Sequence, residues 1–374
     1  MKYVIYLWLC ICFFSCKQSA KQISMESASV DDTLETSIVQ KSLPELIAEE
    51  LFFKGKDIFG NVIELKGTQI VADTVIFKIQ GAESIVKEDK LLLNTNGQFL
   101  LFHLPDFRFE GFYGKWGNGP DEFIYPHIVP AKNDNSLLCY LFESAKGKLY
   151  GMDKSGQISA HPFRFDNPEG GFKYSSKQIV NIAPDDFIYA DDSPTGKSIF
   201  RATVEADTVS KREVFNLGLN SKRISPFSYI GDFVANPNKN RMVYAYKYFK
   251  MIKFMDLEAQ TVRTINFERE VFDENTLYKI NGLDQNVTHY WGACAQDEYV
   301  YFLYSGRTPY DVAKDNGKHN FYIFVEQYDW NGNPVNKFKL DQWGYFTVDE
   351  PNKKLYLMST NHDDPFFIYD LPSD

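Results

Sequence analysis

The sequence has little cysteine, and the positions of its five cysteines argue against a disulfide-stapled scaffold. Cys10 and Cys12 lie in an apolar N-terminal run, while Cys139 and Cys294 are far apart, each inside a strand-like segment. A disulfide framework needs a dense set of cysteines at short spacings. We therefore expect Cys139 and Cys294 to be two buried thiols rather than a disulfide, and neither has a neighbour with metal-ligand spacing.

The motifs of several common enzyme classes are also missing. The six histidines are scattered, and no His-Glu-x-x-His, Cys-x-x-Cys, nucleophile elbow or phosphate-binding loop occurs. This absence argues against zinc hydrolases and nucleoside triphosphatases. It does not exclude an enzyme whose site gathers single residues from distant segments, because such spacing is not legible in a sequence.

Positive charge and long apolar runs are scarce as well. The formal net charge is −10 and no basic cluster occurs, so we expect no nucleic-acid partner. The apolar run from Tyr3 to Phe14 is too short to span a bilayer as a helix. It has the length of the core of a secretory signal.

Residues 1–16 are typical of such a signal, because Lys2 is the only charge before the apolar run. The run ends in Ser15-Cys16, and a small residue followed by Cys resembles the lipobox of bacterial lipoproteins. That resemblance implies that the Cys16 thiol carries diacylglycerol, so the chain would meet a membrane through its N-terminal lipid. The alternative is an ordinary cleaved signal with an incidental Cys16.

Residues 17–42 predict a flexible tether, being rich in Ser, Gln, Thr and acidic residues and poor in aromatics. Lys17-Gln18 is not the acidic run of a surface-export signal, so we expect the periplasmic side of the outer membrane, with the outer surface as the alternative. Ser42-Leu-Pro-Glu45 resembles a helix start, and residues 43–374 are expected to form the folded domain.

The folded part repeats a pattern of short apolar strands joined by tight turns. Aromatic residues make up 16% of the chain, with 32 Phe and 23 Tyr, which favours strands that pack on both faces. Asp followed shortly by Gly between alternating apolar residues is a strong hairpin signal. The predicted hairpins are centred on Asp153, Asp329, Asp256 and Asp106, the last two without a Gly.

These hairpins divide the chain into six groups spaced by roughly 50 residues, the period of a propeller blade. We expect an all-β, six-bladed β-propeller with four-stranded antiparallel blades and no amphipathic helix between them. The last group has only three strands, and Asn61–Lys78 is predicted to supply the missing outer strand and close the ring. The groups span 84–113, 124–165, 176–216, 226–267, 287–340 and 344–371.

The most unusual run is Gly114-Lys-Trp-Gly-Asn-Gly-Pro-Asp-Glu-Phe123, which cannot form a helix or a central strand. We expect a built loop in which Trp116 packs down as a plug. A loop of this pattern between two blades, in a chain with a lipobox, resembles the TolB-like six-bladed propeller family of Bacteroidetes and, more distantly, the NHL-repeat propellers. The resemblance covers about 60–374 and implies a fold and an envelope setting, but no activity.

Topology predicts which face of the ring carries function. The loops between blades and the loops joining second to third strands emerge on one face, and the tight Asp hairpins emerge on the other. All the long connections belong to the first face, and long loops on a rigid scaffold carry binding sites. These connections are 114–123, 164–175, 191–197, 217–226, 267–287, 305–320 and 359–365.

Acidic residues on this face have two interpretations each. Asp121 and Glu122 could bind a cation or a basic group, whereas Glu122 could instead accept backbone N–H bonds within its own loop. Asp191 and Asp192 could hold Ca²⁺ together with loop carbonyls, or form a solvated acidic turn.

Basic and aromatic residues there are candidate ligand contacts. Arg307 and Lys247 could read a carboxylate or sulfate, and Tyr248 could stack on a sugar ring, although surface charge and strand packing are the plain alternatives. His362 could transfer a proton or bind a metal if a partner faces it. Trp116, Trp291 and Trp343 could be ligand platforms, but we interpret them as plugs against the blade rims.

The function that follows is a membrane-anchored binding or scaffold module for a protein or glycan in the cell envelope, without catalysis or a required cofactor. The alternative is a propeller enzyme of the lactonase, lyase or glycan hydrolase class, with Ca²⁺ held at the channel mouth.

Overall fold

The structure is a computed structural model. The predicted signal, tether and helix start all lie outside the residues that it describes, as do Cys16 and Asp121. The described residues are 58–71, 83–95, 97–119, 122–164, 178–205, 208–222, 224–266 and 286–372.

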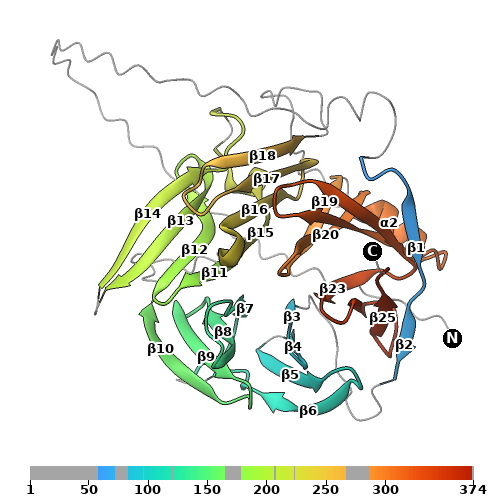
Figure 1. Cartoon of the computed structure of the whole chain (residues 1–374), viewed down its shortest axis with the longest axis horizontal. Helices are drawn as coiled ribbons and strands as arrows, with labels where there is room; N and C mark the ends of the chain where they lie inside the picture. Colours follow the sequence, from blue (N-terminus) through green and yellow to red (C-terminus); the bar gives the residue numbers. More distant parts are fainter. Residues whose placement is uncertain are drawn as a thin grey trace, which may run out of the picture. The chain divides into compact units, whose positions relative to one another are not determined.

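Six antiparallel sheets form a ring around a central axis, which confirms the six-bladed β-propeller (Figure 1). In each blade the first strand lies nearest the middle of the ring. Blade 1 contains β3 (Glu83–Lys87), β4 (Lys90–Thr95), β5 (Gln98–His103) and β6 (Arg108–Tyr113). Blade 2 contains β7 (Pro126–Pro130), β8 (Leu137–Glu143), β9 (Lys148–Asp153) and β10 (Ile158–Arg164). Blade 3 contains β11 (Gln178–Ala183), β12 (Asp186–Ser193), β13 (Gly196–Glu205) and β14 (Thr208–Asn216).

The other three blades follow the same order. Blade 4 contains β15 (Gly231–Asn236), β16 (Arg241–Tyr246), β17 (Met251–Met255) and β18 (Thr261–Asn266). Blade 5 contains β19 (Thr288–Ala295), β20 (Tyr299–Arg307), β21 (Ile323–Asp329) and β22 (Pro334–Leu340). Blade 6 contains β23 (Gly344–Asp349), β24 (Lys354–Ser359) and β25 (Phe366–Asp370), with β2 (Thr68–Ile70) as its outer strand.

The predicted ring closure is confirmed. Strand β2 pairs antiparallel with β25, with Thr68 opposite Ile368 and Ile70 opposite Phe366. A second N-terminal strand, β1 (Val62–Leu65), adds in parallel to β22 and makes blade 5 five-stranded, which the sequence did not predict. The N-terminal segment therefore ties two neighbouring blades together.

The middle strands of the blades are continuous apolar runs because each blade is covered by a neighbour on both faces. In blade 1, Leu91–Leu93 and Leu100–Phe102 are fully buried. The blades meet through such runs: Phe102 of blade 1 packs edge-on against Phe366 of blade 6, with ring centroids 5.3 Å apart. Such packing on both faces explains the high aromatic content.

Within the described ranges, three short helices lie between strands, which corrects the prediction that no amphipathic helix would interrupt them. They are the 3-10 helices η1 (Pro226–Tyr229) and η2 (Pro237–Lys239) and the α-helix α2 (Pro309–Asn316). Helix α2 begins at Thr308, whose hydroxyl accepts the Asp311 N–H, and Pro309 occupies its first turn. In the described part of the chain, no helix is both long and apolar enough to cross a membrane.

The predicted thiols are present as free cysteines. Cys139 is buried, whereas Cys294 is only half-buried, so the expectation of two buried thiols is met in full by Cys139 alone. Burial raises the pKa of the Cys139 thiol strongly, which keeps it protonated and unreactive.

Candidate functional site

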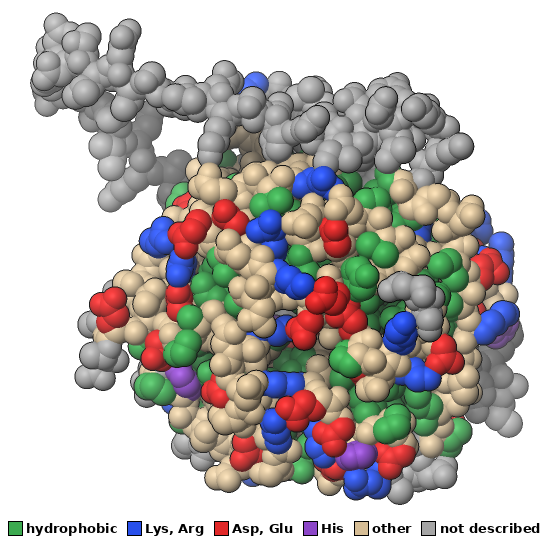
Figure 2. Space-filling model, in the orientation of Figure 1, with side chains coloured by type: hydrophobic (Ala, Val, Ile, Leu, Met, Phe, Trp, Pro, Cys, Tyr) green, Lys and Arg blue, Asp and Glu red, His purple; other side chains and the backbone are tan. Residues whose placement is uncertain are grey.

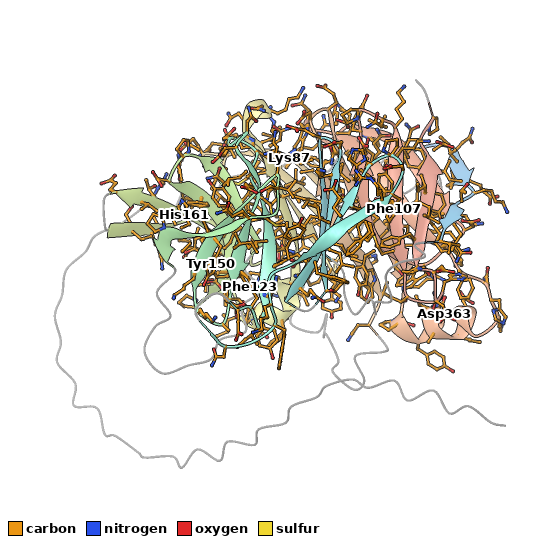
Figure 3. The ribbon with its side chains drawn as sticks, turned by 90° about the horizontal axis from the view of Figure 1, so that it is seen from below. Lys87, Phe107, Phe123, Tyr150, His161 and Asp363 are labelled. Carbon is orange, nitrogen blue, oxygen red and sulfur yellow. The ribbon has the colours of Figure 1, made fainter. Side chains whose placement is uncertain are left out.

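The ring has two faces that differ in how their connections are built. One face, here called the hairpin face, carries the first-to-second and third-to-fourth strand turns. The other, here called the loop face, carries the second-to-third strand loops and the connections between blades. Figure 3 views the ring from its edge, with Lys87 towards the hairpin face and Phe123 and Asp363 towards the loop face.

The hairpin face is tightly held across and around the axis. Lys132 of blade 2 forms an ion pair of 3.6 Å with Asp297 of blade 5, the blade on the opposite side of the ring. The Lys87 ammonium donates to three carbonyls of blade 2, at 2.7–2.8 Å. Figure 2 looks onto this face and shows acidic and basic side chains gathered around its middle. A ligand approaching from this side meets charges that are already paired with protein groups.

The loop face instead exposes large apolar side chains. Trp116, Phe227 and Tyr310 are 67%, 65% and 60% exposed, and all three lie in loop-face connections. Among the described residues, no exposed large apolar side chain lies in a hairpin-face turn. The remaining exposed ones on the loop face are Val71, Tyr125, Ile224 and Val287, and those on the outer strands are Val62, Phe112 and Val262.

The loop 114–123 is a built structure, as predicted. Glu122 Oε2 accepts the Gly119 N–H at 2.8 Å, and Oε1 pairs with Lys115 at 3.0 Å. The Gly119 hydrogen bond and then Lys115 lower the pKa of the Glu122 carboxyl. The interpretation of Glu122 as a backbone acceptor within its own loop is therefore confirmed. Its role as a ligand contact stays a prediction.

Two residues of blade 2 hold this loop in place, and the sequence pattern did not identify either of them. The buried Glu143 carboxylate accepts the N–H groups of Ile124, Tyr125 and Ala145, at 2.7–3.2 Å. Lys146 donates to the carbonyls of Gly119 and Glu122. The sequence signal for Glu143 was its position as an acidic residue at the end of an apolar strand.

The predicted plug is the wrong residue. Trp116 is exposed, whereas Phe123 is 1% exposed and packs edge-on against Phe99 and Tyr150. A backbone bridge joins Trp116 to Phe123, and the Phe123 N–H donates to the Lys115 carbonyl. This register turns Phe123 into the core and Trp116 outward. Trp291 and Trp343 do pack against the core of blades 5 and 6, as expected.

Asp191 and Asp192 lie near the end of β12, paired with Ser198 and Lys197 of β13, rather than in a turn. Asp191 Oδ1 accepts the Asp192 N–H at 2.9 Å, and Asp192 pairs with Lys197 at 3.5 Å. No group of three or more His, Cys, Asp or Glu side chains is placed to hold a metal ion within the described ranges. The Ca²⁺ site proposed for these residues stays an untested prediction.

Arg307 and His362 are both engaged by protein groups. Arg307 pairs with Asp315 at 2.9 Å, donates to the Tyr322 carbonyl at 2.6 Å and stacks over the Tyr322 ring. It is therefore not a free surface cation. His362 Nε2 lies 2.8 Å from Gln342 Oε1, and its ring packs against Phe367.

Two pairs of inner strands share a clasp at their loop-face ends. In blades 3 and 4, Gln178 Oε1 accepts the Phe233 N–H at 2.6 Å, while its Nε2 donates to Asp232 at 3.3 Å. Burial raises the pKa of the Asp232 carboxyl to about 6, against the opposing effects of Lys247 and Gln178.

The equivalent clasp in blades 1 and 2 uses a carboxylate and an imidazole. Glu83 bonds the His127 ring at 2.7 Å and accepts the Ile128 N–H at 2.8 Å. Burial opposes a charge on His127, but the hydrogen bond and charge of Glu83 outweigh it and raise its pKa. This imidazole is therefore held in place by Glu83 between two inner strands.

Cations and aromatic rings converge at the loop-face ends of blades 4 to 6. The Lys247 ammonium lies 4.6 Å from the Trp291 ring centroid and 5.6 Å from that of Tyr248. Trp291 meets Trp343 edge-on at 5.7 Å, and the Arg307 guanidinium lies 5.7 Å from the Trp343 ring. We call these five residues the cationic-aromatic cluster. All five keep part of their surface accessible.

Backbone irregularities put this cluster together. The pairing of β19 with β20 shifts on either side of Tyr290, so Trp291 is an extra residue in a β-bulge. Bulges re-aim side chains and are frequent beside functional sites. Gly306, just before Arg307, has a φ of +64°, which a glycine adopts without strain. The sequence signals, Trp-Gly at 291 and Gly-Arg at 306, were visible but not interpretable without the register.

Comparison with known proteins supports the fold alone. No protein-family model matches the sequence, and no curated protein matches it. A crystal structure of a member of the DUF4221 family from Bacteroides vulgatus is 12% identical, covers 83% of this chain and 96% of its own, and has a TM-score of 0.54. That similarity agrees with the six-bladed ring.

Two further solved structures are more distant. A protein from Bacteroides fragilis described as a candidate exported protein is 9% identical to this chain, with a TM-score of 0.49. The match covers 84% of this chain and the whole of that protein's chain. A calcium-binding regucalcin from Agrobacterium tumefaciens is 13% identical to this chain, with a TM-score of 0.46. The match covers 83% of this chain and 95% of the regucalcin chain. Both similarities are too weak to carry an argument about function.

Proposed function

We propose that the protein is a membrane-anchored envelope lipoprotein whose propeller is a binding module for a protein or glycan partner. The observation that carries this proposal is the contrast between the two faces of the ring. The loop face exposes Trp116, Phe227 and Tyr310, whereas the hairpin face is bridged by charges such as Lys132 and Asp297.

Exposed aromatic side chains are the residues from which binding surfaces draw most of their energy. Each one left in water forgoes roughly 1.5–3 kcal/mol of burial free energy, which a partner recovers by covering it. Seven such apolar side chains on one face, counted among the described residues, fit a surface that a partner covers. The rigid ring underneath keeps the ordering cost of binding low.

The surface test compares two triple variants of the full-length chain. Trp116→Ser, Phe227→Ser and Tyr310→Ser together remove the main exposed aromatics of the loop face. Val62→Ser, Phe112→Ser and Val262→Ser together make the matched change on the outer strands. We expect the first variant to lose at least tenfold in affinity for envelope glycan and purified envelope protein fractions, measured by biolayer interferometry. Equal affinity of the two variants would contradict the proposed face.

The anchor is tested separately. Cys16 precedes the predicted tether, so Cys16→Ser is expected to move the protein from the membrane pellet to the soluble envelope fraction and to abolish labelling by a palmitate analogue. A variant that stays in the pellet and keeps its label would remove the lipid anchor from the proposal. The calcium-dependent enzyme stays the alternative, and metal analysis of the purified full-length chain is its first test.

A further inference from the structure

The cationic-aromatic cluster has donors and aromatic faces but lacks an acceptor. No hydrogen bond or ion pair reaches the Lys247 ammonium from any described residue; it rests on the Trp291 and Tyr248 rings. Trp291 Nε1 is buried and likewise has no hydrogen-bond partner among the described residues. Two donors without acceptors among the described residues thus lie in one neighbourhood. The group missing from it is an anion.

The local charge supports the same reading. The Asp232 carboxyl acts on Lys247 through space, and the two side chains form no ion pair within 4.0 Å. Arg307 pairs with Asp315, so among the described residues Lys247 is the cation of the cluster that has no ion pair within 4.0 Å.

The lysine is fixed by its backbone from two blades. Its N–H donates to the Ile230 carbonyl at 2.8 Å, and its carbonyl accepts the His289 N–H at 2.7 Å. The ammonium therefore stays at the contact between blades 4 and 5. Burial lowers its pKa, partly offset by Asp232, so the protein does not solvate this charge fully. An anionic ligand would compensate the positive charge that water solvates only in part.

The aromatic members indicate what carries the anion. Trp291 and Tyr248 place their rings beside the ammonium, and Trp343 packs edge-on against Trp291. All three residues are partly exposed, and aromatic faces stack on sugar rings. A flat ring surface next to a single point cation suits a pyranose that bears a carboxylate or a sulfate. The aromatic ring faces favour a sugar ring over an extended acidic peptide.

Building on the proposed binding function, we infer that the cationic-aromatic cluster binds an acidic sugar. Lys247 contacts the carboxylate or sulfate group, and Trp291 and Tyr248 hold the sugar ring. The Trp343 indole separates this position from the Arg307–Asp315 pair, which acts as a structural support. Asp232 opposes this binding, because its negative charge repels the anion when it is ionised.

The experiment titrates the full-length protein with size-matched oligosaccharides and follows tryptophan fluorescence and calorimetric heat. The probes are a tetra-galacturonate, a sulfated tetrasaccharide and neutral maltotetraose, with an acidic tetrapeptide as a fourth arm. We expect one or both anionic sugars to bind at least tenfold more tightly than maltotetraose, and their affinity to fall as the salt concentration rises. Preference between the first two probes identifies the anionic group.

Matched variants locate the site. Lys247→Met keeps the length and packing of the side chain and is expected to weaken anionic-sugar binding at least tenfold, without changing maltotetraose binding. Lys115→Met removes an exposed loop-face lysine and should change neither. Asp232→Asn should tighten anionic-sugar binding three- to tenfold. Circular dichroism confirms that each variant is folded.

Each result decides between the two proposals. If Lys247→Met binds anionic sugars as well as the unmodified chain, or if only the acidic tetrapeptide binds, the acidic-sugar inference is wrong. The proposed binding function survives that result as long as the loop-face triple variant still loses its partner. If the triple variant also keeps full affinity, both proposals fall.

Discussion

Single buried side chains decide how the loop face is held and charged. Glu143 shows this most directly, since one carboxylate gathers three backbone N–H groups beneath the loop 114–123. Hydrogen bonds to a charged acceptor contribute about 1.5–3 kcal/mol each in favourable cases. The loop is therefore shaped by a residue outside it.

Asp232 provides the clearest pH-dependent prediction. Its pKa is about 6 in the folded chain, whereas an unfolded Asp titrates near 3.9. As the pH rises from about 4 to about 6, the unfolded chain releases this proton while the folded chain still holds it, so the folded state loses stability. Asp232→Asn should therefore stabilise the protein by about 1–3 kcal/mol at pH 7.5 and make little difference at pH 4.

Urea unfolding curves at the two pH values measure this difference. Asp363→Asn, an exposed change on the same face, is the control and should shift neither curve. A difference between Asp232→Asn and the unmodified chain that is the same at both pH values would show that Asp232 is not the titrating group.

At the scale of elements, three hairpins share one turn chemistry. Asp153, Asp256 and Asp329 each use Oδ1 to accept the N–H groups two and four residues ahead, at 2.8–3.0 Å. Each turn then needs a residue with positive φ. Gly156 and Gly332 supply it at +87° and +80°, but the third hairpin has Ala259 at +64°.

Ala259→Gly is therefore expected to stabilise blade 4. An alanine in the left-handed region carries a steric penalty that glycine avoids, and the expected gain is about 0.5–1 kcal/mol. The midpoint of thermal unfolding should rise by a degree or two on this basis. Gly332→Ala is the reverse change, with a new Cβ 2.9 Å from Phe254, and should lower the midpoint. A fall in midpoint for Ala259→Gly would refute the shared turn.

At the scale of the whole molecule, stability depends on the N-terminal segment reaching blades 5 and 6. Between β1 and β2 the chain passes Gly67, whose N–H donates to Asp341 at 3.1 Å. A Cβ at this position would lie 2.6 Å from the fully buried Tyr369 ring. The closing strand has no room for a side chain at this point.

Gly67→Val should displace β2 and destabilise the ring by about 1–3 kcal/mol through overpacking. Loss of β2 also leaves β25 as an unpaired edge, so we expect the variant to self-associate. Gly317→Ala is the matched control, because its φ is −63° and its nearest new contact would be at 3.4 Å. Thermal unfolding and light scattering measure both effects, and an unchanged Gly67→Val protein would show that β2 is dispensable.

Much of this architecture is local in origin and was predictable. Asp153 and Gly156 define a hairpin by neighbouring residues alone, so the blades and their hairpins could be located from sequence. The exchange of Trp116 for Phe123 as the plug could not be predicted, because it depends on which residue a long-range bridge turns inward. The cluster around Lys247 was likewise invisible, since its members come from loops and strands of three blades.

By itself, the sequence determined the number of blades, the closing strand and the face that carries the long loops, because each rests on strand periodicity and turn chemistry within a few residues. Only the tertiary structure decided that β1 adds to blade 5, that Lys132 meets Asp297 across the axis, and that Lys247 has no ion pair with any residue that the structure describes. The physical reason is that ion pairing and burial depend on distances between blades, and those distances are set by packing around the whole ring.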